Sequence, residues 1–161
     1  MESPQCGRRV APSRARGNRL TTGLWTPRRR QAFSSSHRLF SRELGEDASR
    51  KTYGKCTNVH GHNYVLFVTV RGEVGAADGM VMNLVDLKTI IQEEVMDQLD
   101  HKSIDAHPWF NEGERPSTVE NVAVFCFERI HARLPAGATV SKVKVYETEN
   151  NVAVYRGETT A

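Results

Sequence analysis

The sequence lacks long apolar runs and is poor in cysteine. None of its apolar stretches approaches the roughly 20 residues that a membrane-spanning helix needs, so we exclude an integral membrane protein. Its three cysteines, Cys6, Cys56 and Cys126, have unrelated spacings that do not form a disulfide framework. We therefore expect a protein of a reducing compartment, the cytoplasm.

Most of the chain also lacks an excess of positive charge. The net charge is +3, but residues 1–30 hold eight arginines against one acid, which gives this segment +7. The remaining 131 residues carry 14 basic and 18 acidic groups, a net charge of −4. Because the basic character belongs to the beginning of the chain, we do not expect the domain that follows to bind nucleic acid.

Residues 1–30 have few apolar residues, three prolines and no clear periodicity. This composition predicts a disordered, arginine-rich N-terminal extension. An arginine-rich and acid-poor start also fits a mitochondrial transit peptide, and this alternative stays open. Residues 31–161 form one domain, and the composition of the chain, 39% hydrophobic and 25% charged, is ordinary for a globular protein.

Alternation of apolar and polar residues predicts four strands. The first, residues 32–39, would carry on one face Phe33, Ser35, His37 and Leu39. A polar loop over residues 41–59 leads to the clearest strand, residues 60–74, which has apolar residues at every second position. A short extended piece follows at residues 80–84. Residues 140–147 and 151–157 form the last two strands, joined by a tight turn.

Apolar residues at helical spacing predict two helices between these strand pairs. The first covers residues 84–99. The second begins near Ser117, which can form a capping box with Glu120. The element order ββααββ predicts an α+β fold in which two helices cover one face of a four-stranded antiparallel sheet. We expect the unpaired sheet edges to pair with other subunits.

Two histidines, His60 and His62, are separated only by a glycine at the start of the second strand. Side chains at i and i+2 of a strand lie on the same face, so both imidazoles can contact one ion. The alternation of the first strand places His37 on the buried face as well. Three neutral imidazoles with an open fourth position are typical of a catalytic zinc site.

Cys56 precedes these histidines in a glycine-flanked loop. Its thiolate could be a fourth ligand that closes the metal site. It is equally well placed to act as a base or nucleophile. The pattern alone does not separate these two roles.

Two further features could take part in proton transfer or in ligand binding. Asp100 and His101 form an acid–imidazole pair of the kind that tunes proton transfer, although a histidine is also favourable at an ordinary helix end. Glu147 is predicted to face inward on a strand. A buried carboxylate needs a cationic or multi-donor partner, and a guanidine-like ligand would serve.

Several motifs together resemble the 6-pyruvoyl-tetrahydropterin synthase family over residues 31–158. They are HGHNY after a nearby cysteine, GMVMNLVDLK, LDHKSID, PSTVENVAV and KVYETENNVAVYRGE. The resemblance implies the tunnelling fold, in which three subunits close a barrel and two rings stack into a homohexamer. It also implies zinc-dependent conversion of 7,8-dihydroneopterin triphosphate to 6-pyruvoyl-tetrahydropterin, with release of triphosphate, in tetrahydrobiopterin biosynthesis.

The resemblance also assigns roles to residues. It implies that the zinc ligands are His37, His60 and His62, that Cys56 is the catalytic base, and that Asp100 and His101 activate the cysteine of an adjacent subunit. It further implies that Glu147 holds the 2-amino-pyrimidinone edge of the pterin, with supporting contacts from Thr118 and Glu120.

Two positions depart from the pattern of the mammalian members. The spacing Cys-x3-His-Gly-His is two residues shorter than theirs and is similar to that of bacterial 6-carboxy-tetrahydropterin synthases of queuosine biosynthesis. Val119 stands where a second threonine is common. The alternatives are therefore a 6-carboxy-tetrahydropterin synthase, which also releases a two-carbon fragment, and a non-catalytic pterin- or zinc-binding module.

Overall fold

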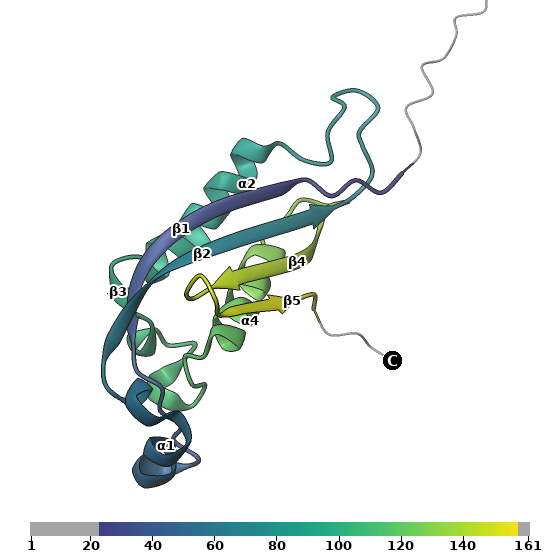
Figure 1. The fold of residues 1–161 in the computed structure, drawn as a ribbon. Helices are drawn as coiled ribbons and strands as arrows, with labels where there is room; N and C mark the ends of the chain where they lie inside the picture. Colours follow the sequence, from purple (N-terminus) through teal and green to yellow (C-terminus); the bar gives the residue numbers. More distant parts are fainter. Residues whose placement is uncertain (1–22, 158–161) are drawn as a thin grey trace, which may run out of the picture.

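The computed structural model describes residues 23–157, which form one sheet with helices on one of its faces (Figure 1). The strands are β1 (Arg28–His37), β2 (His60–Arg71), β3 (Lys102–Ser103), β4 (Thr139–Tyr146) and β5 (Val152–Tyr155). The helices are α1 (Gly45–Tyr53), α2 (Leu84–Ile91), α3 (Asp97–Leu99) and α4 (Val119–His131). The predicted α+β class is confirmed. No helix of the described region is long and apolar enough to cross a membrane.

The sheet has the strand order β3-β1-β2-β4-β5. The four predicted strands are present, and neighbours among them pair antiparallel. The predicted four-stranded sheet needs one correction, because β3 adds a fifth strand that pairs parallel with Ser35 and Ser36 of β1. A two-residue strand has no alternation pattern, so the sequence gives no sign of it.

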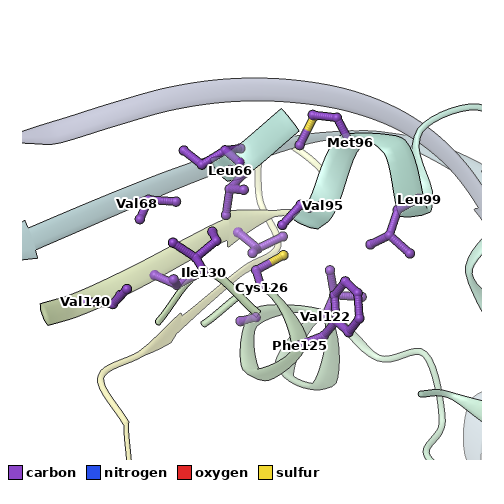
Figure 2. Packing of buried hydrophobic residues seen from close by; sticks show 14 of the residues in the cluster. Leu66, Val68, Val95, Met96, Leu99, Val122, Phe125, Cys126, Ile130 and Val140 are labelled. Atoms are coloured by element: carbon purple, nitrogen blue, oxygen red, sulfur yellow. The ribbon is translucent and has the colours of Figure 1, made fainter. Parts of the chain in front are cut away.

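The hydrophobic core lies between the sheet and the helices. In Figure 2, Leu66, Val68 and Val140 of the sheet face side chains from the helical layer, including Val95, Leu99 and Cys126. Leu134 is partly buried, and Leu84, the first residue of α2, is 41% exposed. The other apolar residues whose spacing predicted the two helices are buried: Leu87, Ile91, Val95, Leu99, Val122, Ala123, Cys126 and Ile130. Burial raises the pKa of the Cys126 thiol, as expected for a packing residue.

The predicted helix over residues 84–99 is continuous but contains a π-helical segment, Gln92–Met96, between α2 and α3. This segment buries Glu94, whose carboxylate forms ion pairs with one arginine in α4 and one just beyond its end. One contact, to Arg129, is 2.6 Å long, and the second is to Arg133. A carboxylate that is only 9% exposed needs such partners, so these ion pairs connect the π-helical segment to the end of α4.

Three local predictions were wrong. The loop predicted for residues 41–59 contains α1, a polar helix with acids in its first turn and basic residues in its last turn, an arrangement favoured by the helix dipole. Residues 80–84 do not form a strand. The capping residue of α4 is Thr118, whose hydroxyl accepts the N–H of Asn121 at 3.4 Å, and not Ser117.

The boundary of the N-terminal extension also needs correction. Residues 28–30 were predicted to belong to the extension, but they form the beginning of β1 and pair with Thr69, Val68 and Phe67. Trp25 forms a further bridge with Gly72. Pairing with a long neighbouring strand outweighs the polar composition of this stretch. The expected disorder and the targeting alternative fall mainly on residues 1–22, which lie outside the described residues.

This boundary predicts a difference between two deletions. Removing residues 1–22 leaves every described strand intact, so we expect almost no change in Tm. Removing residues 1–30 deletes three residue pairs of β1, the Trp25–Gly72 bridge and the contact of Arg28 over the Phe67 ring at 5.0 Å. We expect a Tm several degrees lower, since 1 kcal/mol corresponds to about 2–4 °C in a domain of this size. Equal melting of the two proteins by circular dichroism would contradict this.

Candidate metal centre

Three histidines converge at one end of the sheet. His37 is the last residue of β1, and its cross-strand partner is His60, the first residue of β2. One ring nitrogen from each of His37, His60 and His62 lies within 4.8 Å of the other two. The ring centroids of His60 and His62 are 4.9 Å apart, as the shared face of i and i+2 predicts. This group could hold a metal ion.

Gly61 allows the two strands to approach closely at this point. A Cβ atom at Gly61 would lie 3.1 Å from the carbonyl oxygen of Ser35 on β1, closer than ordinary van der Waals contact. A side chain at this position would push β2 away from β1. The glycine between the two histidines therefore keeps His60 and His62 close to His37.

Backbone carbonyls fix the tautomers of two of the histidines. Nδ1 of His37 lies 2.9 Å from the carbonyl oxygen of Ser117, and Nδ1 of His60 lies 2.8 Å from that of Asn58. Because a carbonyl oxygen can only accept, both Nδ1 atoms must carry the hydrogen. Each Nε2 is then unprotonated, which is the form that binds a metal.

The surroundings also favour the neutral imidazoles that a metal needs. Burial is the largest cause that lowers the pKa of His37 below 6.5, and the neighbouring histidines lower it further. Burial likewise lowers the pKa of His62. The Ser117 carbonyl opposes this effect at His37, and Glu147 opposes it at both rings. At neutral pH little proton release is required before these ligands bind an ion.

Glu147 follows β4 and faces the same cluster, as its parity predicted. Its Oε1 is 3.7 Å from Nε2 of His37 and 3.8 Å from Nε2 of His62. Its side chain is 15% exposed. Together with His62 it borders a cavity of about 680 Å³, whose walls include the rings of Phe67 and Tyr146. The structure thus places a carboxylate between the histidines and a space large enough for a bicyclic ligand.

Cys56 lies in a one-turn helix, Gly54–Thr57, that precedes β2. Its carbonyl accepts the N–H of Leu39 at 2.7 Å, which holds the cysteine segment against the chain just beyond His37. The thiol is half-buried and unpaired. Within residues 23–157, the group of converging donor atoms consists of the three histidines and does not include this thiol.

Asp100 and His101 follow α3 and form the expected pair, with Oδ1 of Asp100 3.0 Å from Nδ1 of His101. The same oxygen accepts the N–H of Ser34 at 2.8 Å, and this hydrogen bond is the main cause that lowers the pKa of Asp100. His101 has φ 58° and an imidazole that is 83% exposed. It lines the same shallow cavity, about 480 Å³, as His62.

Thr118 and Glu120 lie at the start of α4, where Thr118 is the capping residue and Glu120 is exposed. The contact from this segment to the histidines comes from the preceding residue, Ser117, whose backbone carbonyl and hydroxyl lie 2.9 and 3.3 Å from Nδ1 of His37. Sequence reasoning missed Ser117 and Asn58 as hydrogen-bond acceptors, because any residue supplies a carbonyl. It also missed the hydroxyl of Tyr64, 3.5 Å from Nε2 of His37, although the parity of the strand could have revealed it.

Comparisons with known proteins point to one family. Residues 27–158 match the family model described as 6-pyruvoyl tetrahydropterin synthase. The human 6-pyruvoyl tetrahydrobiopterin synthase is 50% identical over 133 residues, which cover 81% of this chain and 90% of that protein. The 6-carboxy-5,6,7,8-tetrahydropterin synthase of Haemophilus influenzae is 29% identical over 124 residues, 64% of this chain and 85% of that protein.

A solved structure agrees with these relatives. The 6-pyruvoyl tetrahydropterin synthase of Caenorhabditis elegans has a TM-score of 0.76 to this chain and 38% sequence identity. The match covers 84% of this chain and 97% of that chain.

The metal assignment is testable with one substitution. His62→Ala removes one of three converging nitrogens and should lose most of the bound metal, because two protein ligands hold zinc poorly when the other positions are open. The measurement is zinc per subunit by mass spectrometry after dialysis. His131→Ala is the matched control, since His131 is an exposed histidine of α4 that stacks on Phe127. Full metal content in His62→Ala would mean that the ligands are misassigned.

Proposed function

Because this chain belongs to the 6-pyruvoyl tetrahydropterin synthase family, we propose that it converts 7,8-dihydroneopterin triphosphate to 6-pyruvoyl-tetrahydropterin and releases triphosphate. It would act as a lyase in tetrahydrobiopterin biosynthesis. The observation that carries this proposal is the juxtaposition of three convergent histidines with the carboxylate of Glu147, 3.7 Å from His37 and 3.8 Å from His62. It occurs in a chain that is 50% identical to the human enzyme of that name.

We propose zinc as the metal, held by His37, His60 and His62. Three imidazole nitrogens with a remaining open position are the donor set of catalytic zinc sites. The support is that both assigned tautomers present Nε2 and that burial keeps His37 and His62 neutral. A bound zinc ion would supply Lewis-acid stabilisation of negative charge on oxygens of the substrate side chain.

Glu147 would orient the pterin ring. A carboxylate can accept two parallel N–H hydrogen bonds from a 2-amino-pyrimidinone edge, a bidentate geometry that fixes both position and rotation. The aromatic residues Phe67 and Tyr146 line the adjoining cavity and offer apolar surface to the ring. Thr118 and Glu120, at the start of α4, would add supporting contacts.

Cys56 would act as the base that removes a carbon-bound proton from the substrate side chain. Its segment is bonded to Leu39, two residues after His37, and its thiol is outside the converging donor group, which supports this role over that of a fourth ligand. Asp100 and His101 would tune the thiol of an adjacent subunit, since an imidazole that is 83% exposed is accessible to another chain. Cys56 and Cys126 are free thiols, which fits activity in a reducing compartment, and we propose the cytoplasm.

The sheet has edges suited to assembly. β5 lies at one edge, and Val152 and Val154 on it are each 43% exposed. At the other edge, β3 pairs only with Ser35 and Ser36, so most of β1 in the described region is open on that side. We propose that β5 of one subunit pairs with β1 of the next, so that three subunits close a barrel and two barrels form a hexamer.

The alternative, a 6-carboxy-tetrahydropterin synthase, rests on the short spacing between Cys56 and His60. The relatives favour the first proposal, with 50% identity to the human 6-pyruvoyl enzyme against 29% to the carboxy enzyme of Haemophilus influenzae. Sequence identity across the whole domain is stronger evidence for the function than a difference of two residues in the length of one loop.

Incubation of the zinc-loaded protein with 7,8-dihydroneopterin triphosphate tests the function directly. Mass spectrometry should detect triphosphate together with 6-pyruvoyl-tetrahydropterin. Release of a two-carbon fragment with a 6-carboxy product would support the alternative enzyme. If the protein holds zinc but releases no triphosphate, the non-catalytic binding module becomes the better interpretation.

The role of Cys56 is tested by Cys56→Ala. If Cys56 is the base, turnover should fall about 10²–10⁴-fold, the range for loss of a positioned proton-transfer group. Zinc content should stay unchanged, because the three histidines complete the protein's share of the site. Cys126→Ala is the control, since Cys126 is a thiol buried in the core. A Cys56→Ala protein that loses its zinc would refute the base assignment.

A further inference from the structure

Asp105 connects two segments of the chain that are far apart in sequence. It lies in a one-turn helix, Ile104–Ala106, directly after β3. Its Oδ2 accepts the backbone N–H of Arg38 at 2.7 Å. Its Oδ1 accepts the hydroxyl of Ser117 at 2.6 Å. The carboxylate therefore holds the end of β1 and the approach to α4 at a fixed separation.

These two segments are the ones that hold His37. Arg38 is the next residue in the chain after His37. Ser117 is fully buried, and its carbonyl oxygen accepts the Nδ1–H of His37 at 2.9 Å. The ring of His37 is 1% exposed and lies between the two segments that Asp105 connects. Movement of either segment would therefore change the direction in which Nε2 of His37 points.

The other two histidines are held differently. His60 donates to the carbonyl of Asn58, a residue of its own segment that lies two positions earlier. Nε2 of His62 has Glu147 as its charged neighbour at 3.8 Å. Neither contact involves Asp105. Of the three converging nitrogens, Asp105 therefore affects the position of Nε2 of His37 alone.

We propose that Asp105 is a positioning residue for the metal centre. By holding Arg38 and Ser117 together, it fixes the Ser117 carbonyl on Nδ1 of His37 and so sets the tautomer and direction of that ligand. This inference rests on the proposed metal site. Partners that orient a ligating histidine in this way typically contribute about 10–100-fold to metal affinity.

The two oxygens of Asp105 act as acceptors, which makes Asp105→Asn an informative variant. An asparagine keeps one oxygen for the N–H of Arg38 and places an amide N–H toward Ser117. The Ser117 hydroxyl can then donate to the carbonyl of Arg38, which lies 3.3 Å from it. We therefore expect Asp105→Asn to retain most of the connection. Asp105→Ala should lose both contacts of the carboxylate and keep only the contact between the Ser117 hydroxyl and the Arg38 carbonyl.

The first measurement is zinc affinity by competition with a chromophoric chelator. Asp105→Ala should bind zinc about 10–100-fold more weakly than the wild type, and Asp105→Asn should lie closer to the wild type. Asp78→Ala is the matched control, since this carboxylate accepts a backbone N–H in an exposed turn. Ile130→Val controls for stability, because it weakens the core without contact to His37. Wild-type affinity in Asp105→Ala would overturn the proposal.

The second measurement is the tautomer of His37 in the metal-free protein, by long-range ¹⁵N–¹H NMR. The wild type should carry the hydrogen on Nδ1, and Asp105→Ala should show a mixture of tautomers. An unchanged Nδ1–H form in Asp105→Ala would contradict the proposal, even if its zinc affinity fell. Wild-type protein that binds no zinc would instead refute the metal site, and the tautomer would still test Asp105.

Ser117→Ala keeps the test decisive if Asp105→Ala does not fold. It retains the carbonyl that His37 contacts but removes the hydroxyl, which donates to Asp105 and also lies 3.3 Å from Nδ1 of His37. We expect weaker zinc binding and a partial loss of the Nδ1–H tautomer. Ser117→Ala protein with both properties unchanged would overturn the proposal.

Discussion

The antiparallel register of β1 and β2 is the constraint on which the candidate site depends. It sets His37 opposite His60 and places His62 one step further along the same face. A shift of one residue would turn the whole face of β1 away from the core. The buried residues Phe33, Tyr64 and Leu66 oppose such a shift, because it would expose or misplace them. The packing of the core therefore also defines the geometry of the candidate metal centre.

The sequence was sufficient to predict the parts of the site that follow from strand periodicity. His60 and His62 share a face, His37 has the matching parity, and Glu147 faces inward, because side chains in strands alternate with a period of two. The hydrogen-bond partners of the histidines could not be predicted. Ser117 and Asn58 use backbone carbonyls, and these carry no residue-specific signal.

The prediction of the fold failed where local composition and tertiary contacts disagree. Helix α1 is polar along its length, so it has no apolar period that the sequence could reveal, and only Ser49 in it is buried. Strand β3 is too short for any pattern. Both Ser117 and Thr118 are good capping residues. The choice between them is set by the contacts of Ser117 with Asp105 and His37, which no local rule includes.

The direction of β1 places the histidine cluster far from the point where the preceding chain joins the sheet. Arg28 begins this strand and His37 ends it, so the beginning of β1 and the histidine cluster are separated by about 30 Å of extended chain. In Figure 1 the beginning of β1 and helix α1 accordingly lie at opposite ends of the described fold. Evolution can therefore lengthen or exchange the sequence before β1 without disturbing the histidine cluster. For protein engineering, this end is the natural position for an affinity tag or a fused partner.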